Sequence, residues 1–416
     1  MSMYNFLSIN LFLVTSCILC VPVLFSLGLS CFGGILVGSN YFIFDSLAFY
    51  LIILVVFLGI FSVVSFNSGL SPTTKGFLLL SLLFSAFSFC VNHSILFWCF
   101  YELSMLPLLY LIFHDSPYSE RFLAGWYFAV YLLITSLPLI LALLYLSFVN
   151  GTCFFSSWES GKASLVVYVV LAFIFFTKVP LSPFHTWLPI VHAEATSIVS
   201  IFLSGYIMKL GLLGVYRCSP FIFGGGFYTY LFFCCVFSVF FLITASSELD
   251  GKRWLAFLSL SHIVVPFLGY YVCDWESVSL TFLFCLGHGL SAGLVFGFLW
   301  FFYDSTNSRN WLLLKSGISG KFSTFVIVFG LLSLCSFPPT LQFFCEVYLL
   351  TQSSGSYLFL VFWACYLFLG GLVPLTLCGH VLIRSESLES VTYLLYNYLF
   401  YFFYLTVWCY LGVALL

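Results

Sequence analysis

Long apolar runs separated by short polar stretches make up almost the whole of this 416-residue sequence. A helix needs roughly 20 apolar residues to cross the hydrocarbon core of a bilayer. Runs of about this length predict membrane-spanning helices over residues 6–28, 41–66, 76–92, 94–114, 121–149, 163–181, 192–217, 221–247, 254–273, 277–303, 322–350, 356–382 and 391–416. The stretch 1–40 contains Pro22 and Gly33 and can instead hold two short helices. The pattern therefore predicts an all-α polytopic membrane protein with thirteen or fourteen spans.

Composition agrees with this pattern and excludes several classes of protein. The chain is 63% apolar and 6% charged, whereas a soluble domain is about 45–50% apolar and about 25% charged. The polar connections are too short to fold as separate domains, so the chemistry is expected inside the membrane. A net charge of −2 and the lack of a basic run longer than Lys252-Arg253 exclude a nucleic-acid-binding protein. Nearly all of the 16 cysteines lie in apolar runs, where a thiol behaves as a small hydrophobe, so no metal site is predicted.

Basic residues outside the apolar runs are unequally divided between the two faces of the predicted bundle. If successive connections alternate sides, one face carries Lys75, Arg121, Lys252, Arg253, Arg309, Lys315, Lys321 and Arg384. The opposite face carries Lys162 and Arg217. Connections that stay in the matrix or the cytoplasm keep Lys and Arg, so the first face is predicted to be that side.

Four charged residues lie inside apolar runs: Glu102, Lys178, Lys209 and Glu346. Each costs about 2.5–3.5 kcal/mol on insertion scales, so each needs a reason to be there. One reason is structural, because paired charges can hold helices together. The other is proton transfer, because buried ionisable groups change protonation with small changes in their surroundings. Glu102 and Lys178 are predicted to form a pair that opens and closes, in a relay with Lys209 and Glu346.

Two clusters of proline interrupt predicted spans close to these charges. Residues 178–189 place three prolines beside Lys178 and His185, and Pro338-Pro339 precedes Glu346 by about two helical turns. Backbone carbonyls freed by proline at membrane depth often form ion sites in transporters built from inverted repeats. We therefore predict an inverted-repeat bundle with two proline-broken helices. Its units are 1–75, 76–217 as a first repeat, 218–385 as a second repeat, and 386–416 as a final helix.

Histidine has the intrinsic pKa best suited to proton transfer near neutral pH. His262 and His288 lie in successive predicted spans between Lys209 and Glu346. Together with His185 they are assigned a supporting role in the relay. A buried histidine can also be an ordinary core residue, and the sequence leaves that reading open.

In these motifs the chain resembles the antiporter-like subunits of respiratory complex I, which are related to Mrp-type cation/proton antiporters. The resemblance covers about residues 41–380 and rests on the motifs Phe100-Tyr101-Glu102-Leu103, Lys178-Val179-Pro180, His185-Thr186-Trp187-Leu188-Pro189, His192-Ala193-Glu194-Ala195, Lys209-Leu210-Gly211, Asp250-Gly251-Lys252, Ser259-Leu260-Ser261-His262 and His288-Gly289-Leu290. Most members have lysine where this chain has Glu346, whereas glutamate after Pro-Pro-Thr is typical of the subunit 4 branch. Thr196 in place of proline, Gly251 in the Asp-x-Lys motif, and a shorter N-terminal region depart from the family pattern.

The resemblance implies a proton-translocating subunit of NADH:ubiquinone oxidoreductase that carries out no redox chemistry itself. Flavin, iron–sulfur clusters and quinone are then expected in other subunits, and this chain is expected to hold no cofactor and no metal. Expected partners are other membrane-arm subunits, especially the antiporter-like subunits 2 and 5, and lipids, but no nucleic acid. The lack of a presequence, together with 55 Phe and 16 Cys, fits a gene encoded inside an organelle, so the mitochondrial inner membrane is the expected location.

Two other functions remain open at this point. A stand-alone Mrp-type antiporter that exchanges cations for protons shares these motifs. A structural subunit without pumping activity, in which the buried polar residues only hold helices together, is also compatible with the sequence.

Overall fold

The computed structural model describes residues 35–66, 69–159, 161–274, 277–313, 321–383 and 392–415. The predicted span 6–28 lies outside these residues, as do Lys315 and Arg384. Within the described part, nine helices are long and apolar enough to cross a membrane, and shorter apolar helices accompany them. The prediction of an all-α polytopic fold is therefore confirmed.

The helices of the first half lie within residues 46–218. They are α2 (Ser46–Leu54), continued by the π-helical turn η2 (Val55–Ile60) and α3 (Phe61–Ser65); α4 (Pro72–Cys90); α5 (Ser94–Asp115); α6 (Arg121–Ala129), continued by η3 (Val130–Ile134) and α7 (Thr135–Asn150); α8 (Leu165–Lys178); α9 (Trp187–Glu194); and α10 (Ser197–Phe202), continued by η5 (Leu203–Ile207) and α11 (Met208–Cys218). A short hairpin of β1 (Ile35–Gly38) and β2 (Ile43–Asp45) precedes them, and the alternative of two short helices within 1–40 falls almost wholly outside the described residues.

The helices of the second half lie within residues 225–411. They are α12 (Gly225–Ser247), α13 (Gly251–His262), α14 (Val264–Val272), α15 (Ser279–Thr306), α16 (Lys321–Leu334), α17 (Leu341–Ser353), α18 (Tyr357–Ile383) and α19 (Thr392–Leu411). Short 3-10 turns are η4 (Phe155–Ser157), η6 (Pro220–Ile222) and η9 (Gly412–Leu415). Each half thus contains one helix that is broken at prolines, as the sequence predicts. The division into four units stays a prediction.

Helix boundaries follow local chemistry, and two differ from the sequence prediction. Ser71 caps α4 by accepting a hydrogen bond from the Thr74 amide, directly before Pro72. The prediction of one span over 192–217 is wrong at its start, because residues 187–194 form the separate helix α9 and the span begins at Ser197. The span predicted over 322–350 is likewise interrupted between α16 and α17, where Pro338-Pro339 cannot continue a helix.

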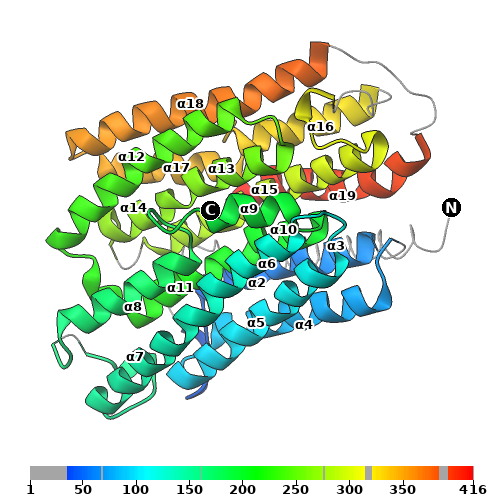
Figure 1. The fold of residues 1–416 in the computed structure, drawn as a ribbon. Helices are drawn as coiled ribbons and strands as arrows, with labels where there is room; N and C mark the ends of the chain where they lie inside the picture. The colour runs from blue at the N-terminus through cyan, green and yellow to red at the C-terminus, as the bar shows by residue number, and fades with distance from the viewer. Residues whose placement is uncertain are drawn as a thin grey trace.

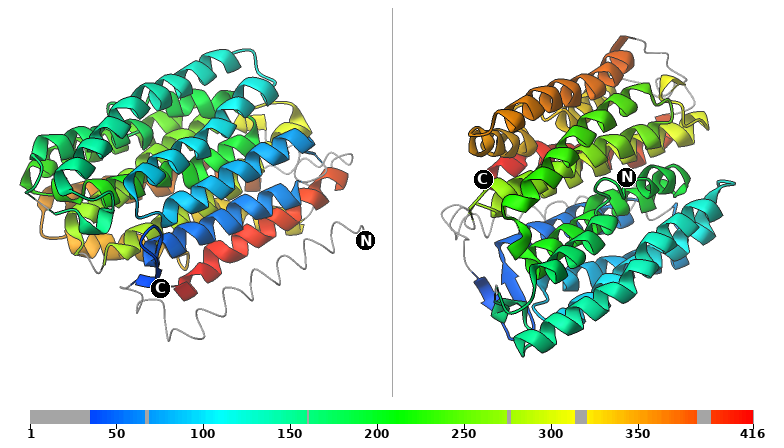
Figure 2. Two further views of the ribbon diagram at one scale, coloured as in Figure 1. Left: turned by 90° about the horizontal axis from the view of Figure 1, so that it is seen from below. Right: turned by 60° about the vertical axis from the view of Figure 1, so that its left-hand side comes forward.

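The two halves lie one above the other in Figure 1, the first in blue to green and the second in green to red. Segments far apart in sequence lie side by side, such as α12 with α18 at the top and α2 with α15 near the centre. Figure 2 shows that α19 returns to lie beside α3, and its Tyr404 and Trp408 pack on Phe57 of η2. The helix α15 is buried over most of its length, so it forms the centre of the contact between the halves.

Glycines allow α15 to approach α2 closely. A Cβ atom on Gly293 would lie 2.0 Å from Leu58 Cδ1, and one on Gly289 would lie 2.7 Å from Leu54 Cδ1. Such distances are far below van der Waals contact, so larger residues would push the two helices apart. His288 and Ser291 lie on the same stretch of α15, and the close packing fixes their position.

Candidate functional site

Glu102 and Lys178 form a buried ion pair at the site where the sequence predicts one. Lys178 Nζ lies 2.8 Å from Glu102 Oε1, and the two side chains are 0% and 11% exposed. The ammonium group also lies 4.3 Å from the centre of the Tyr101 ring, which adds a cation–π contact. The lysine therefore has a carboxylate and an aromatic face as its surroundings in place of water.

The break after Lys178 explains how this pair is positioned. Lys178 is the last residue of α8, where a cation interacts favourably with the helix dipole. After the proline-rich connection the chain resumes as α9, and the Trp187 indole donates a hydrogen bond to the Thr177 carbonyl at 3.0 Å. This bond joins the two pieces of the broken helix next to the lysine. On α5, Pro107 lacks the amide that would otherwise bond the Leu103 carbonyl, one residue after Glu102.

His185 lies in the same break but faces a different element. Its ring packs on Phe241 of α12, with ring centres 4.6 Å apart. His185 therefore extends from the first half toward the second half. The structure brings together Glu102 and Lys178, and it places His185 against α12.

Lys209 is completely buried on α11, and its partner is a backbone carbonyl. The π-helical turn η5 changes the hydrogen-bonding pattern just before it. Lys209 Nζ donates to the Ser204 carbonyl within this turn at 2.5 Å. A Cβ atom on Gly211 would lie 2.4 Å from Val179, so α11 packs directly against the residue that follows Lys178. The first pair and Lys209 are therefore linked by close helix packing.

His262 and His288 lie face to face in the buried interior. Their ring centres are 5.0 Å apart and their planes are within 9° of parallel. His262 Nδ1 lies 2.6 Å from the Leu258 carbonyl. Because a carbonyl only accepts, Nδ1 carries the hydrogen, and Nε2 of the neutral ring is left as the acceptor. Neither ring nitrogen of His288 has a hydrogen-bond partner within the described residues.

Glu346 on α17 is buried within a small polar network. Its Oε1 accepts hydrogen bonds from Gln342 Nε2 at 3.1 Å and from the Tyr366 hydroxyl at 3.3 Å. Tyr366 also meets His262 edge-on, at 5.6 Å between ring centres. On the other side, Ser291 donates to Gln342 Oε1 at 3.4 Å, three residues after His288. Glu346 and the two histidines therefore belong to one polar cluster.

A cavity of about 10 Å³ opens between His262, Ser336, Glu346 and Tyr366. This is about the volume that one water molecule needs, and the lining groups supply donors and acceptors for it. A water at this position would connect the histidine ring to the carboxyl group.

Several polar residues at these sites are not marked by the sequence pattern. Gln342 and Tyr366 are uncharged and lie in apolar helices, so no charge distinguishes them. Lys252 was assigned to a connection, but the structure buries it in the first turn of α13 with 3% exposure. The signal available for Lys252 was the Asp250-Gly251-Lys252 motif, since Asp250 caps α13 and makes the lysine part of the helix. Within the part of the chain that the structure describes, no three metal-ligating side chains meet.

The distribution of basic residues over the two ends of the bundle agrees with the sequence pattern. Tyr118, three positions before Arg121 in the sequence, contacts both Lys252 and Arg309. Arg121, Lys252 and Arg309 therefore lie at one end of the bundle. Arg217 bonds Asp45 and the Phe89 carbonyl at the end where α4 finishes, opposite the end where α4 begins. Which compartment each end faces stays a prediction.

Comparison with known proteins agrees with this geometry. A family model described as "NADH:quinone oxidoreductase/Mrp antiporter, TM" matches residues 91–371. The NADH-ubiquinone oxidoreductase chain 4 of Rhipicephalus sanguineus is 27% identical over 74% of this chain and 72% of its own length. The protein of the same name from Locusta migratoria is 30% identical over 67% of this chain and 64% of its own length. The one from Artemia franciscana is 30% identical over 65% of this chain and 69% of its own length.

Solved structures share the fold. A chain of respiratory complex I from Thermus thermophilus with bound NADH superposes with a TM-score of 0.77, at 20% identity, over 89% of this chain and 82% of its own. A chain of the Mrp complex from a Dietzia species gives a TM-score of 0.72, at 17% identity, over 93% and 76%. At this identity the likeness concerns the fold. On the match to residues 91–371 and the similarity to these relatives, the chain belongs to the NADH:quinone oxidoreductase/Mrp antiporter family of membrane proteins.

Proposed function

We propose that this chain translocates protons as a membrane-arm subunit of an NADH:ubiquinone oxidoreductase, in the position that chain 4 takes among its relatives. The observation that carries the proposal is the buried Glu102–Lys178 ion pair, in a protein that also buries Lys209 and Glu346. Charged residues inside a membrane are costly, so their burial in the interior of the helix bundle favours a role in ion or proton transfer.

The relay is proposed to run through the centre of the bundle. When the Glu102–Lys178 pair is closed, each charge stabilises the other. Opening the pair leaves the lysine in an apolar surrounding, which favours release of its proton. Lys209, the two stacked histidines and Glu346 then offer successive groups that can take up and pass on a proton.

Polar contacts link parts of this route, but the hydrogen bonds between side chains do not form one continuous path. The carboxyl of Glu346 is bonded to Tyr366, whose ring contacts His262. The cavity of about 10 Å³ has room for one bridging water there. Water would have to bridge the remaining intervals, as it does in hydrated polar networks.

The names of the relatives support a place in a larger assembly. Curated relatives are named as chains of NADH-ubiquinone oxidoreductase, which implies other membrane-arm subunits as partners. In that assembly, the neighbours would be antiporter-like subunits 2 and 5, the location would be the mitochondrial inner membrane, and the end carrying Lys252 and Arg309 would face the matrix. Large exposed apolar side chains such as Leu137 and Phe148 on α7 suit contact with lipid or with a neighbouring subunit.

A second candidate function is cation/proton exchange in an Mrp-type assembly, because a chain of such a complex shares the fold. Purification of the native assembly separates the two candidates. We expect the chain to be part of a complex that oxidises NADH and acidifies one side of sealed vesicles without sodium. An assembly that lacks NADH oxidation and moves protons only against sodium would favour the exchanger.

A further inference from the structure

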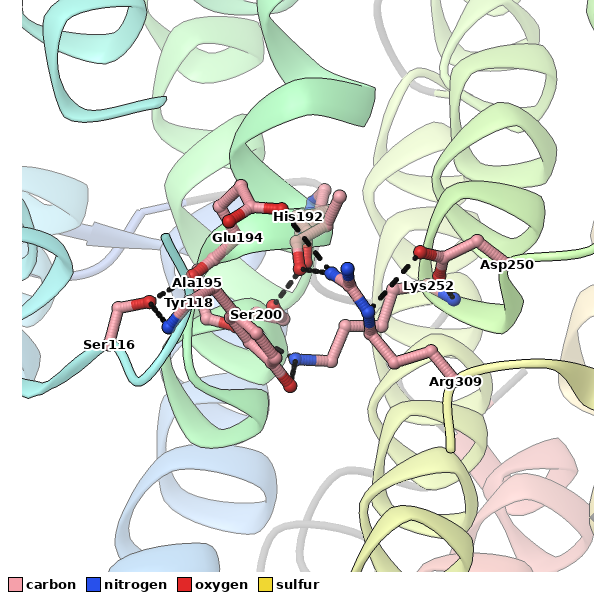
Figure 3. Close-up of polar contacts among 10 residues, drawn as sticks. Ser116, Tyr118, His192, Glu194, Ala195, Ser200, Asp250, Lys252 and Arg309 are labelled. Carbon is pink, nitrogen blue, oxygen red and sulfur yellow. Dashed lines mark hydrogen bonds and ion pairs between the residues drawn. The ribbon is translucent and has the colours of Figure 1, made fainter. Parts of the chain in front are cut away.

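The C-terminal end of α9 is held by side chains that come from several elements (Figure 3). The last turn of a helix leaves carbonyl groups without partners in the helix. Lys252 Nζ donates to the Ala195 carbonyl at 2.8 Å, and Arg309 Nη1 donates to the Ala193 carbonyl at 2.7 Å. The Ser116 hydroxyl donates to the Glu194 carbonyl. We refer to Ser116, Tyr118, Lys252 and Arg309 as the α9 clamp.

Tyr118 contacts both cations of the clamp. Lys252 Nζ is 5.0 Å and Arg309 Cζ is 4.5 Å from the centre of its ring, so both make cation–π contacts. Arg309 also lies 3.3 Å from Glu194 and 3.6 Å from Asp250. Two cations and two carboxylates thus balance one another around a single tyrosine.

The clamp joins the two halves of the protein. Ser116 and Tyr118 belong to the connection between α5 and α6, in the same half as α9. Lys252 lies in the first turn of α13 and Arg309 follows α15, both in the second half. His192, in the last turn of α9, also stacks on Phe296 of α15, at 4.9 Å between ring centres. The second half therefore holds the last turn of a helix that belongs to the first through both polar and ring contacts.

The opposite end of α9 is fixed beside the ion pair. The indole of Trp187, the first residue of α9, donates a hydrogen bond to the carbonyl of Thr177. Thr177 directly precedes Lys178 at the end of α8. A helix of eight residues is about 12 Å long, so the clamped end of α9 lies only about two turns from Trp187. A displacement of its clamped end would therefore be transmitted to the end of α8 that carries the lysine.

We infer that the α9 clamp is a positioning device through which the second half controls the Glu102–Lys178 pair. Lys252 and Arg309 hold α9 in the position that keeps the pair closed, and movement of α13 or of the segment after α15 releases it. The expected effect of the clamp on proton pumping rests on the proposed function, whereas its hold on α9 does not. The two parts can be measured separately.

The first measurement is hydrogen–deuterium exchange of the α9 amides in the intact assembly. Lys252→Met removes the ammonium group and keeps most of the apolar stem. Loss of a charge-assisted hydrogen bond of about 1.5 kcal/mol or more should make exchange at the end of α9 about tenfold faster. Arg253→Met is the matched control, because it removes the same charge from the neighbouring position on α13, outside the clamp.

The second measurement is the number of protons translocated per electron in the same preparations. Lys252→Met should lower this ratio while NADH oxidation continues, and Arg253→Met should leave it unchanged. Lys252→Arg keeps a cation at the end of α9 and should restore both the slow exchange and the ratio. If Lys252→Met does not assemble, Tyr118→Leu replaces it, because it removes the ring that both cations contact and keeps apolar volume.

The outcomes separate the clamp from the proposed function. Unchanged exchange in α9 would show that the clamp does not hold the helix, whatever the pumping result. Faster exchange with an unchanged proton ratio would overturn the positioning role. If the unaltered assembly translocates no protons, the proposed function fails, and the exchange data alone then support or refute the clamp.

Discussion

Lys178 and Glu102 lie 76 positions apart in the sequence and meet at 2.8 Å inside the protein. The lysine ends α8 and the glutamate lies on α5, so the pair bridges two spans. Both side chains are almost completely buried, at 0% and 11% exposed for the lysine and the glutamate. The pair can therefore have two roles: it can hold α5 and α8 together, and it can open and close during proton transfer.

The first prediction separates these two roles by a double-mutant cycle. Glu102→Gln and Lys178→Met each leave a buried partner without its counter-charge, which costs about 3–5 kcal/mol in buried pairs. The double variant should assemble better than the sum of the single effects predicts, by about 1–3 kcal/mol of coupling. The measurement is the heat stability of the assembled complex.

Proton translocation gives the other half of this test. All three variants should translocate fewer protons per electron than the unaltered chain. Additive stability effects would mean that the two residues are not coupled. Normal translocation in the double variant would mean that the pair only holds α5 and α8 together.

A second prediction concerns the joint between α8 and α9. Trp187→Phe removes the hydrogen bond to the Thr177 carbonyl and should cost about 1–3 kcal/mol, because a buried acceptor is left unpaired. It should also lower the proton ratio, since Lys178 lies next to Thr177. Trp158→Phe is the control: its indole likewise donates to a backbone carbonyl at 3.0 Å, at Thr152, but Trp158 precedes the start of α8, whereas the lysine lies at its opposite end.

Thermal denaturation and the proton ratio are measured on both tryptophan variants. Both should lose stability, and only Trp187→Phe should pump less. Equal pumping by the two variants would show that this joint does not position the lysine.

A third prediction concerns Tyr366, which contacts both His262 and Glu346. Tyr366→Phe keeps the ring against His262 and removes the hydroxyl that donates to Glu346. The proton ratio should fall in part, while assembly stays near normal. Tyr401→Phe is the control, because it removes a buried hydroxyl that bonds the Gly293 carbonyl outside this cluster. A similar fall in both variants would show that the effect is not specific to the relay.

A fourth prediction concerns orientation in the membrane. Cysteine substitutions at Lys75 and Arg121 should react with an impermeant maleimide from the matrix side of sealed membranes, and one at Lys162 should react from the opposite side. The reason is the excess of basic residues at one end of the bundle. Labelling of Lys75 and Lys162 positions from the same side would refute the alternation of spans between them.

Four of the residues that the sequence identified share one property: they are charges within apolar runs. Glu102, Lys178, Lys209 and Glu346 stand out because the cost of burying a charge is large and local. Their pairing was also predictable in part, since Glu102 and Lys178 have opposite signs. The contact of His262 with His288 followed from neither charge nor spacing and required the packing of α13 against α15.

What the sequence did not identify depends on boundaries and on neutral groups. Lys252 lies only two positions before the predicted start of a span, so it was placed in a connection, whereas the cap at Asp250 draws it into the helix. The separate helix α9 lies in a proline-rich stretch that predicts a break and gives no sign of where the chain resumes. Gln342 and Tyr366 are polar groups that occur in many helices, and only their distance from Glu346 gives them a role.

The most direct test of proton translocation through the buried groups is the proton-to-electron ratio of Glu346→Gln. The amide has nearly the size of the carboxylic acid and can accept the same hydrogen bonds from Gln342 and Tyr366, but it does not take up a proton. The account predicts an assembled complex that oxidises NADH and translocates fewer protons per electron than the unaltered chain. An unchanged ratio in an equally well assembled complex would contradict it.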